Sequence, residues 1–105
     1  MKEELNRVAE FHRKMRFAEN GGEDMLFRMA LIAEEVGEIA ACLTKNKGDI
    51  AEEHADLLIL VLGNCVSLGI EDRITDVLHA KLERLMQLEP VSSGSHARVI
   101  TGDSR

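Results

Sequence analysis

Turn-forming residues divide most of the chain into four long segments. They cluster at residues 20–22 (Asn-Gly-Gly), at residues 46–48 (Asn-Lys-Gly) and at Gly69, and the single proline is Pro90. Strand signals are sparse, because aromatic residues make up 3% of the chain and β-branched residues do not alternate with polar ones. Long segments without internal breakers therefore predict an all-α fold that resembles a four-helix bundle.

Apolar residues recur at steps of three and four within each segment, as they do on one face of a helix. We expect four helices, at about residues 2–19, 23–47, 49–68 and 71–88. Asp49 suits the N-cap of the third helix, and the fourth must stop before Pro90. These helices predict one domain over residues 1–89, followed by a tail over residues 90–105 that is flexible or crosses a partner subunit.

The third segment is apolar around its whole circumference over residues 57–62. A helix of this kind must be covered on every side, which four short helices of a 105-residue chain can hardly achieve. We therefore expect part of this surface to contact another copy of the chain, so that the protein is a homo-oligomer.

Charge and composition argue against several classes of protein. The net charge of −6 and the pI near 5.2 disfavour nucleic acid as a partner, since binding a phosphate backbone needs clustered Lys and Arg. The charged N-terminus lacks the apolar stretch of a signal peptide, and the apolar run at residues 57–62 is too short to span a membrane. Cys42 and Cys65 lack the spacing of a zinc or redox site, so we expect two buried thiols in a cytoplasmic protein.

Two pairs of acidic residues carry most of the chemical information in the sequence. The second segment carries Glu35 and Glu38 in a Glu-Glu-x-x-Glu motif, and the third carries Glu53 and Asp56 in a Glu-x-x-Asp motif. Positions three apart share a helix face, so the members of each pair project together. The short turn at residues 46–48 makes the two helices antiparallel neighbours, and we expect the pairs to meet across them.

Four carboxylates in such a position repel one another unless a cation lies between them. At an effective dielectric constant of about 20, two carboxylates about 4 Å apart repel by roughly 4 kcal/mol. Oxygen ligands favour Mg²⁺, with Mn²⁺ as a substitute, over zinc or copper. A di-iron site is disfavoured because it needs Glu-x-x-His on two helices, and the nearest match is the lone pair Asp76 and His79. The alternative that the residues leave open is a solvated acidic helix face.

Residues 31–39 (Leu-Ile-Ala-Glu-Glu-Val-Gly-Glu-Ile) and residues 52–58 (Glu-Glu-His-Ala-Asp-Leu-Leu) resemble the MazG family in both motifs and their spacing. The similarity extends over about residues 25–81. It implies an all-α fold, a dimer or dimer of dimers, and a metal centre of four acids, Glu35, Glu38, Glu53 and Asp56. The resemblance also places Glu34 at the first acid of the motif, so Glu34 and Glu35 are the candidate catalytic residues.

MazG-family enzymes convert nucleoside triphosphates to monophosphates and pyrophosphate, so the resemblance implies a Mg²⁺-dependent pyrophosphohydrolase that acts on NTPs or dNTPs. The chemistry is attack of a metal-activated water on a phosphoanhydride, and the task it suggests is house-cleaning of non-standard nucleotides. Candidate phosphate contacts are four basic residues, Arg28, Lys45, Lys47 and Lys81. The alternatives are a related enzyme, such as a phosphoribosyl-ATP pyrophosphohydrolase or a dUTPase-like protein, and a non-catalytic helical interaction module.

Overall fold

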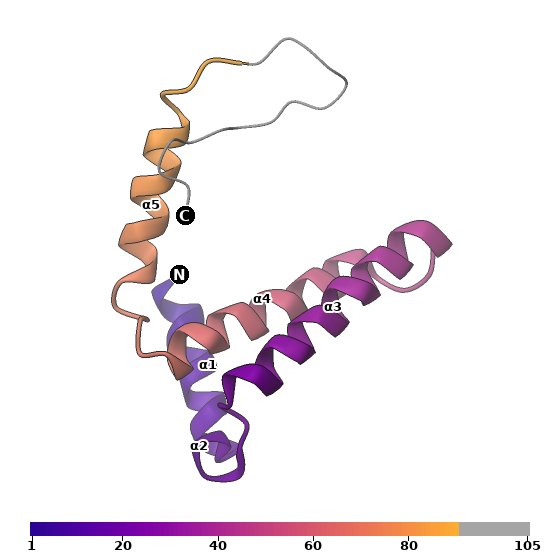
Figure 1. Ribbon diagram of the computed structural model, residues 1–105, viewed down its shortest axis with the longest axis vertical. Helices are drawn as coiled ribbons and strands as arrows, with labels where there is room; N and C mark the ends of the chain where they lie inside the picture. Colours follow the sequence, from indigo (N-terminus) through magenta and orange to yellow (C-terminus); the bar gives the residue numbers. More distant parts are fainter. Residues whose placement is uncertain (91–105) are drawn as a thin grey trace. The chain divides into compact units, whose positions relative to one another are not determined.

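The computed structural model describes residues 1–90 and shows five helices (Figure 1). Their bounds are Lys2–Lys14 (α1), Phe17–Asn20 (α2), Met25–Lys45 (α3), Ile50–Ser67 (α4) and Ile74–Leu85 (α5). No strand occurs within these ninety residues, which confirms the predicted all-α fold. The tail predicted for residues 90–105 lies, apart from Pro90, outside the described residues.

The first predicted helix is interrupted, so the prediction of one helix up to residue 19 was wrong. Helix α1 ends at Lys14, Arg16 adopts a left-handed conformation with φ of 59°, and the short α2 follows. After this break in the helix, the centre of the Phe17 ring lies 5.5 Å from that of Phe11 and 5.0 Å from that of His12, and both pairs meet edge to face. Contact among these three rings offsets the cost of an unfavourable backbone conformation at a residue other than glycine.

Helices α3 and α4 form an antiparallel hairpin, and the residues at their ends explain its bounds (Figure 1). The side chain of Asp24 accepts a hydrogen bond from the Phe27 amide at the start of α3, and Asn46 ends the helix in a left-handed conformation with φ of 49°. The side chain of Asp49 then accepts hydrogen bonds from the first amides of α4. The predicted start and end of both helices are confirmed.

The described residues divide into two units, the first over Met1–Asp72 with α1 to α4 and the second beginning at Arg73 and containing α5. Helix α5 begins three residues after the expected start at Glu71, because residues 71–73 form a turn. None of its residues is buried. The single domain over residues 1–89 remains a prediction.

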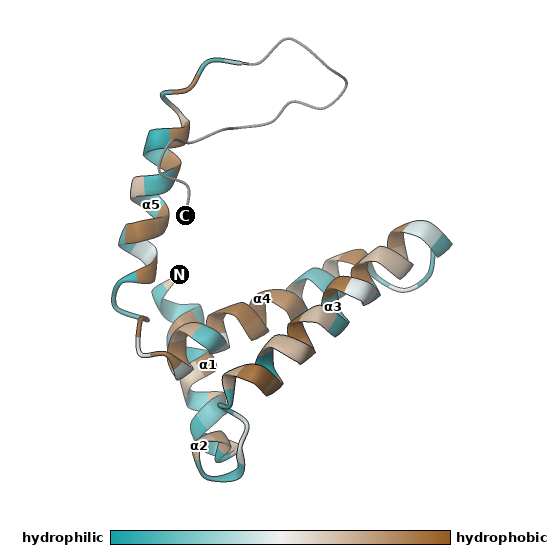
Figure 2. Cartoon of the chain, viewed as in Figure 1, coloured by the Kyte–Doolittle hydropathy of each residue, from teal (hydrophilic) through white to brown (hydrophobic). Residues whose placement is uncertain are grey.

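The apolar core of the first unit is small. It contains Leu5 and Val8 from α1, Leu62 and Cys65 from α4, and Cys42 from α3, and the expectation that both cysteines are buried free thiols is confirmed. Apolar residues follow much of α3 and α4 in Figure 2, yet of residues 57–62 on α4 Leu62 alone is buried. No helix within residues 1–90 has the length and apolar character needed to cross a membrane.

Gly63 lies where α4 meets polar side chains from both α1 and α3. A Cβ atom at this position would collide with Nη2 of Arg28 and would lie 2.8 Å from Nε2 of His12. Both side chains are buried, with exposed fractions of 3% and 4%. Glycine in the middle of a helix is unfavourable by itself, so its place here follows from the room that the two polar groups need.

We expect Gly63→Ala to destabilise the protein although alanine favours helix. The helix preference of alanine contributes up to about 1 kcal/mol, whereas overpacking typically costs about 1–3 kcal/mol and here also displaces a hydrogen-bonded guanidinium. The measurement is thermal unfolding followed by circular dichroism. Gly37, where an added Cβ meets nothing within 4 Å, is the matched control on α3, and Gly37→Ala should raise the melting temperature. A rise for both variants would contradict the packing described for Gly63.

Candidate metal centre

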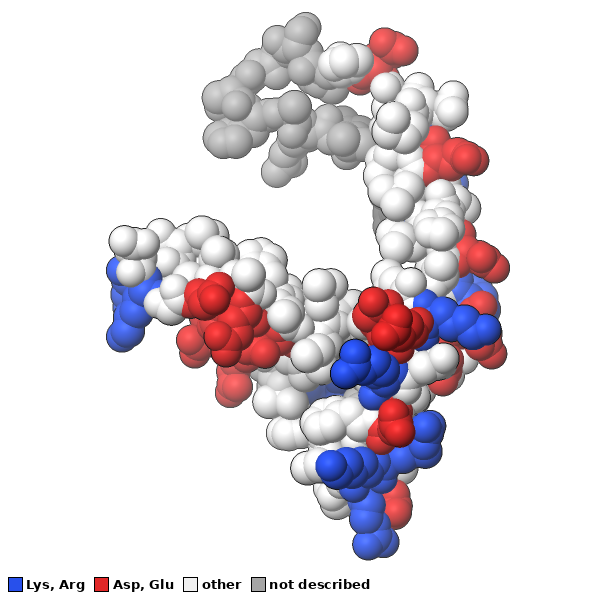
Figure 3. All heavy atoms as spheres, turned by 180° about the vertical axis from the view of Figure 1, so that it is seen from behind, with Lys and Arg blue, Asp and Glu red and all other residues white. Residues whose placement is uncertain are grey.

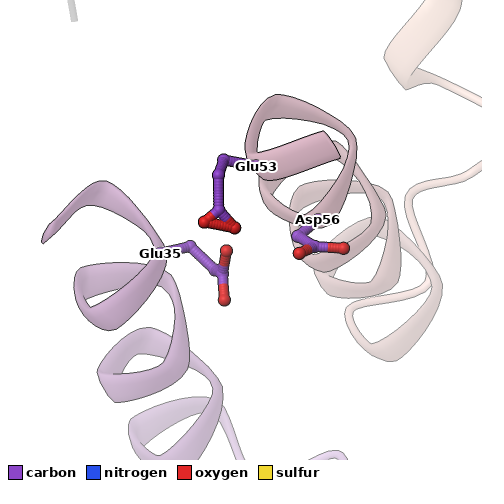
Figure 4. A group of neighbouring side chains, drawn as sticks. All are labelled: Glu35, Glu53 and Asp56. Atoms are coloured by element: carbon purple, nitrogen blue, oxygen red, sulfur yellow. The ribbon is translucent and has the colours of Figure 1, made fainter. Parts of the chain in front are cut away.

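Three of the four predicted ligands lie together across the helical hairpin. Glu35 projects from α3, and Glu53 and Asp56 project from α4, so that one carboxylate oxygen of each lies within 4.8 Å of those of the other two (Figure 4). Glu35 and Glu53 point toward each other, with Asp56 beside them. We call these three residues the acidic cluster.

The two remaining acids of the first motif lie next to the acidic cluster. Glu38 is exposed one turn after Glu35, and its charge contributes to raising the pKa of Glu53. Glu34 is exposed as well and lines a pocket together with Glu35 and Asp56. Figure 3 shows the resulting concentration of acidic side chains on the arm formed by α3 and α4. The fourth predicted ligand, Glu38, is therefore close enough to act on the cluster electrostatically without being one of its three members.

Two members of the acidic cluster have raised pKa values, because they are shielded from water and repelled by neighbouring negative charges. Partial shielding from water raises the pKa of Glu35, and repulsion by Asp56, Glu53 and Glu38 raises it further. Shielding and the charges of Glu38 and Asp56 raise the pKa of Glu53 in the same way. Oε1 of Glu35 is moreover withdrawn from solvent without a hydrogen-bond partner. A shielded carboxylate oxygen without a donor, surrounded by like charges, fits a cation as its missing partner.

The raised pKa values predict how the stability of the metal-free protein depends on pH. Because the pKa of Glu35 is higher in the folded chain than its ordinary value of 4.5, the folded state binds this proton more tightly than the unfolded state. The resulting contribution to the free energy of unfolding is fully present below pH 4.5 and is lost as pH rises through the raised pKa. In EDTA, Glu35→Gln should therefore be more stable than the wild type at pH 7, and the difference should shrink as pH falls toward 4.5. Urea unfolding of both proteins across this range measures it. If the two proteins differ in free energy of unfolding by the same amount at pH 7 and at pH 4.5, the neighbouring carboxylates exert no net repulsion on Glu35.

A pocket of about 250 Å³ opens beside the acidic cluster. Its polar side consists of Glu34, Glu35 and Asp56, and the other side is formed by Leu31, Ile59 and Leu60. Ligand pockets combine an apolar wall with a few converging polar groups in this manner. The apolar wall was not foreseen from the sequence, where Ile59 and Leu60 belonged to the apolar run expected to be covered on every side and in part to contact another copy.

Two of the predicted phosphate contacts lie at the turn between α3 and α4. Lys45 and Lys47 are exposed there, and Figure 3 shows basic side chains at the tip of the arm, next to the acidic group. Lys45 follows Glu38 by seven residues, which places it on the same helix face about 10 Å further along. Lys81 lies on α5, in the second unit of the chain.

Arg28, also predicted as a phosphate contact, is instead used inside the fold. Its side chain is 3% exposed, and its three types of nitrogen donate hydrogen bonds to Asn64, Leu60 and Gly22. A buried guanidinium with three of its five N–H donors already engaged is a poor partner for a phosphate. The sequence signal that was overlooked is Asn64, a polar residue that follows Gly63 within the most apolar helix of the chain.

The two histidines of the first unit lie outside the acidic cluster. His12 is buried with Nδ1 3.1 Å from Oε2 of Glu23, and Nδ1 of the exposed His54 lies 2.8 Å from the carbonyl oxygen of Ile50. Neither was assigned a role from the sequence, and both have partners in the fold.

An all-α chain with carboxylates gathered across an antiparallel helix pair has the features of a MazG-like pyrophosphohydrolase. A family model described as phosphoribosyl-ATP pyrophosphohydrolase matches residues 1–84, and the chain belongs to this family. The family is part of the MazG-like superfamily of all-α nucleoside triphosphate pyrophosphohydrolases, so the resemblance seen in the two acidic motifs is confirmed. Comparisons with curated proteins and with solved structures gave no match.

Proposed function

We propose that the protein hydrolyses a nucleoside triphosphate to the monophosphate and pyrophosphate with Mg²⁺ held by the acidic cluster. The observation that carries this proposal is the meeting of three carboxylates, one of them with a shielded oxygen that lacks a hydrogen-bond partner. Family membership supports the pyrophosphohydrolase class. Mn²⁺ should substitute for Mg²⁺, because both ions prefer oxygen ligands.

Glu35, Glu53 and Asp56 would hold the ion, and Glu38, whose charge acts on Glu53, would serve as the fourth ligand. A bound divalent ion supplies positive charge that neutralises phosphate oxygens and lowers the pKa of water. Glu34, exposed on the pocket wall, would accept the proton of the attacking water.

The rest of the site would orient the substrate. The exposed Lys45 and Lys47 would neutralise the departing pyrophosphate, and the apolar wall of the pocket would cover the nucleoside side of the reacting bond. Water adds to one phosphorus of the bond between the α- and β-phosphates, the bridging P–O bond breaks, and the two products separate as monophosphate and pyrophosphate.

A second candidate substrate is phosphoribosyl-ATP, which the family match over residues 1–84 favours. It carries the same triphosphate group as ATP, so the acidic cluster would act on it in the same way. The two candidates differ in what lies beyond the nucleobase. House-cleaning of non-standard nucleotides applies to the first candidate alone.

Pyrophosphate release with Mg²⁺ from a panel of substrates separates these functions. The panel contains the standard NTPs and dNTPs, dUTP, non-standard nucleotides and phosphoribosyl-ATP. Preference for phosphoribosyl-ATP would select the second candidate, and preference for dUTP a dUTPase-like activity. A protein that is folded and binds Mn²⁺ but releases no pyrophosphate from any member would refute the proposal and favour a non-catalytic interaction module.

We also propose that the protein works as a homodimer or dimer of dimers. Exposed fractions of 58% for Leu58, 46% for Ile59 and 42% for Val61 show that the other helices of the first unit leave these residues of α4 uncovered. Such a surface on one small domain favours association through apolar burial. Light scattering after size-exclusion chromatography is expected to give at least twice the chain mass of 11.7 kDa. A folded monomer at micromolar concentration would contradict this proposal.

A further inference from the structure

Arg28 connects α3 to α4 through directed hydrogen bonds. Its Nε donates to Oδ1 of Asn64 over 2.8 Å, and its Nη2 donates to the carbonyl oxygen of Leu60 over 3.0 Å. Nη1 donates to the carbonyl oxygen of Gly22, in the loop before α3, over 3.1 Å. One side chain thus ties the start of α3 to two points, one helical turn apart, on α4.

Burial makes this connection hard to rearrange. The exposed fraction of Arg28 is 3%, and burial lowers the pKa of its guanidinium while the charge of Glu23 acts in the opposite direction. A buried charged group that loses its acceptors is costly, because little water can replace them. The missing side chain at Gly63 provides the room in which the guanidinium lies.

The same helix pair carries the acidic cluster two turns away. Glu35 follows Arg28 by seven residues, so the two share a face of α3 about 10 Å apart. On α4, the two acceptors of Arg28 are residues 60 and 64, and the two acids of the cluster are residues 53 and 56. The midpoint of the acids is 7.5 residues before the midpoint of the acceptors, close to the spacing of seven residues on α3. The chain directions of the two helices are opposite, so moving along α3 from Arg28 to Glu35 corresponds to moving back along α4 from the acceptors to the acids. A single register of α3 against α4 therefore produces both the Arg28 hydrogen bonds and the acidic cluster.

We propose that Arg28 is a positioning residue, which holds α3 and α4 in the register that the acidic cluster requires. Apolar contacts are non-directional and tolerate sliding, whereas a guanidinium bound to fixed acceptors does not. A slip of one residue moves a side chain by about 1.5 Å along the helix and 100° around it, which would turn Glu35 away from its two partners. This inference rests on the proposed metal site and adds the residue that aligns it.

The test compares Mn²⁺ affinity among variants by electron paramagnetic resonance, at a temperature where circular dichroism shows full helicity for each. Arg28→Met keeps an unbranched apolar side chain and removes the donors, and its Mn²⁺ affinity should fall by about tenfold or more. Arg28→Lys, which keeps the charge but cannot donate in a fork, should recover part of the loss. Val8→Ala is the control: Val8 is buried on α1, which packs against α4, so the variant weakens packing while Arg28 and its three acceptors stay unchanged. Its Mn²⁺ affinity should stay within about twofold of the wild type.

Wild-type Mn²⁺ affinity in Arg28→Met would overturn the positioning role, whatever happens to its melting temperature. If Arg28→Met does not fold, Asn64→Ala decides on the same measurement, since it removes one acceptor and leaves the carbonyl oxygens of Leu60 and Gly22 in place. Its affinity should fall measurably below that of Val8→Ala, and equality of the two would overturn the proposal. A wild type without saturable Mn²⁺ binding would refute the metal site of the proposed function itself, and with it this role of Arg28.

Discussion

Asp56→Asn is expected to abolish pyrophosphate release while the helices stay folded. The substitution keeps the shape of the side chain and removes one negative charge from the acidic cluster, so the site holds a divalent ion far less tightly. Turnover should fall by about 100-fold or more, beyond the range typical for residues that only support a ligand. Glu38→Gln should also lower turnover, and the size of that decrease measures how much Glu38 contributes to binding the ion.

Matched measurements separate loss of the site from loss of the fold. Circular dichroism should show unchanged helicity for Asp56→Asn, and its metal-free melting temperature should be equal to or above that of the wild type, because repulsion on Glu35 and Glu53 is relieved. Glu10→Gln removes the same charge from an exposed position on α1 and should keep normal turnover. Near-normal turnover in Asp56→Asn would remove this residue from the metal site.

The helical hairpin and the meeting of its acids could be predicted because the relevant rules are local. Residues three apart share a face of a helix, and a short turn makes consecutive helices antiparallel. Capping by Asp24 and Asp49 fixed the helix ends closely, so Glu35 and the acids of α4 were placed within reach of one another from spacing alone.

The break after α1 could not be predicted, because no glycine or proline marks it. Arg16 adopts its left-handed conformation where Phe17 gains contacts with rings on the preceding helix, and such contacts are tertiary. Arg28 was misassigned for a related reason. A basic residue two turns before an acidic motif suggests a phosphate contact, and its acceptors become visible only when the register of α3 against α4 is known.

Mg²⁺ is expected to raise the melting temperature of the protein. The folded chain gathers carboxylates that repel one another, whereas the unfolded chain scatters them and binds the ion poorly. At a Mg²⁺ concentration about 100 times the dissociation constant, binding contributes about 2.7 kcal/mol to the free energy of unfolding. For a domain of this size that corresponds to a rise of roughly 10–20 °C.

Screening by salt also weakens repulsion between exposed charges, so ionic strength has to be controlled. Na⁺ at matched ionic strength screens the carboxylates but does not bind several oxygens in a fixed arrangement. The stabilisation by Mg²⁺ should saturate with concentration, whereas screening should change gradually. Glu35→Gln, which removes one of the three clustered carboxylates, should lose the saturable part and keep the gradual one.

The most direct test of the central claim is therefore the melting temperature of wild type and Glu35→Gln, titrated with Mg²⁺ and with Na⁺ at equal ionic strength. A metal centre formed by Glu35, Glu53 and Asp56 predicts a saturable rise with Mg²⁺ in the wild type that Na⁺ does not reproduce and Glu35→Gln lacks. Equal shifts with both salts in both proteins would show instead that these acids form a solvated helix face without a metal site.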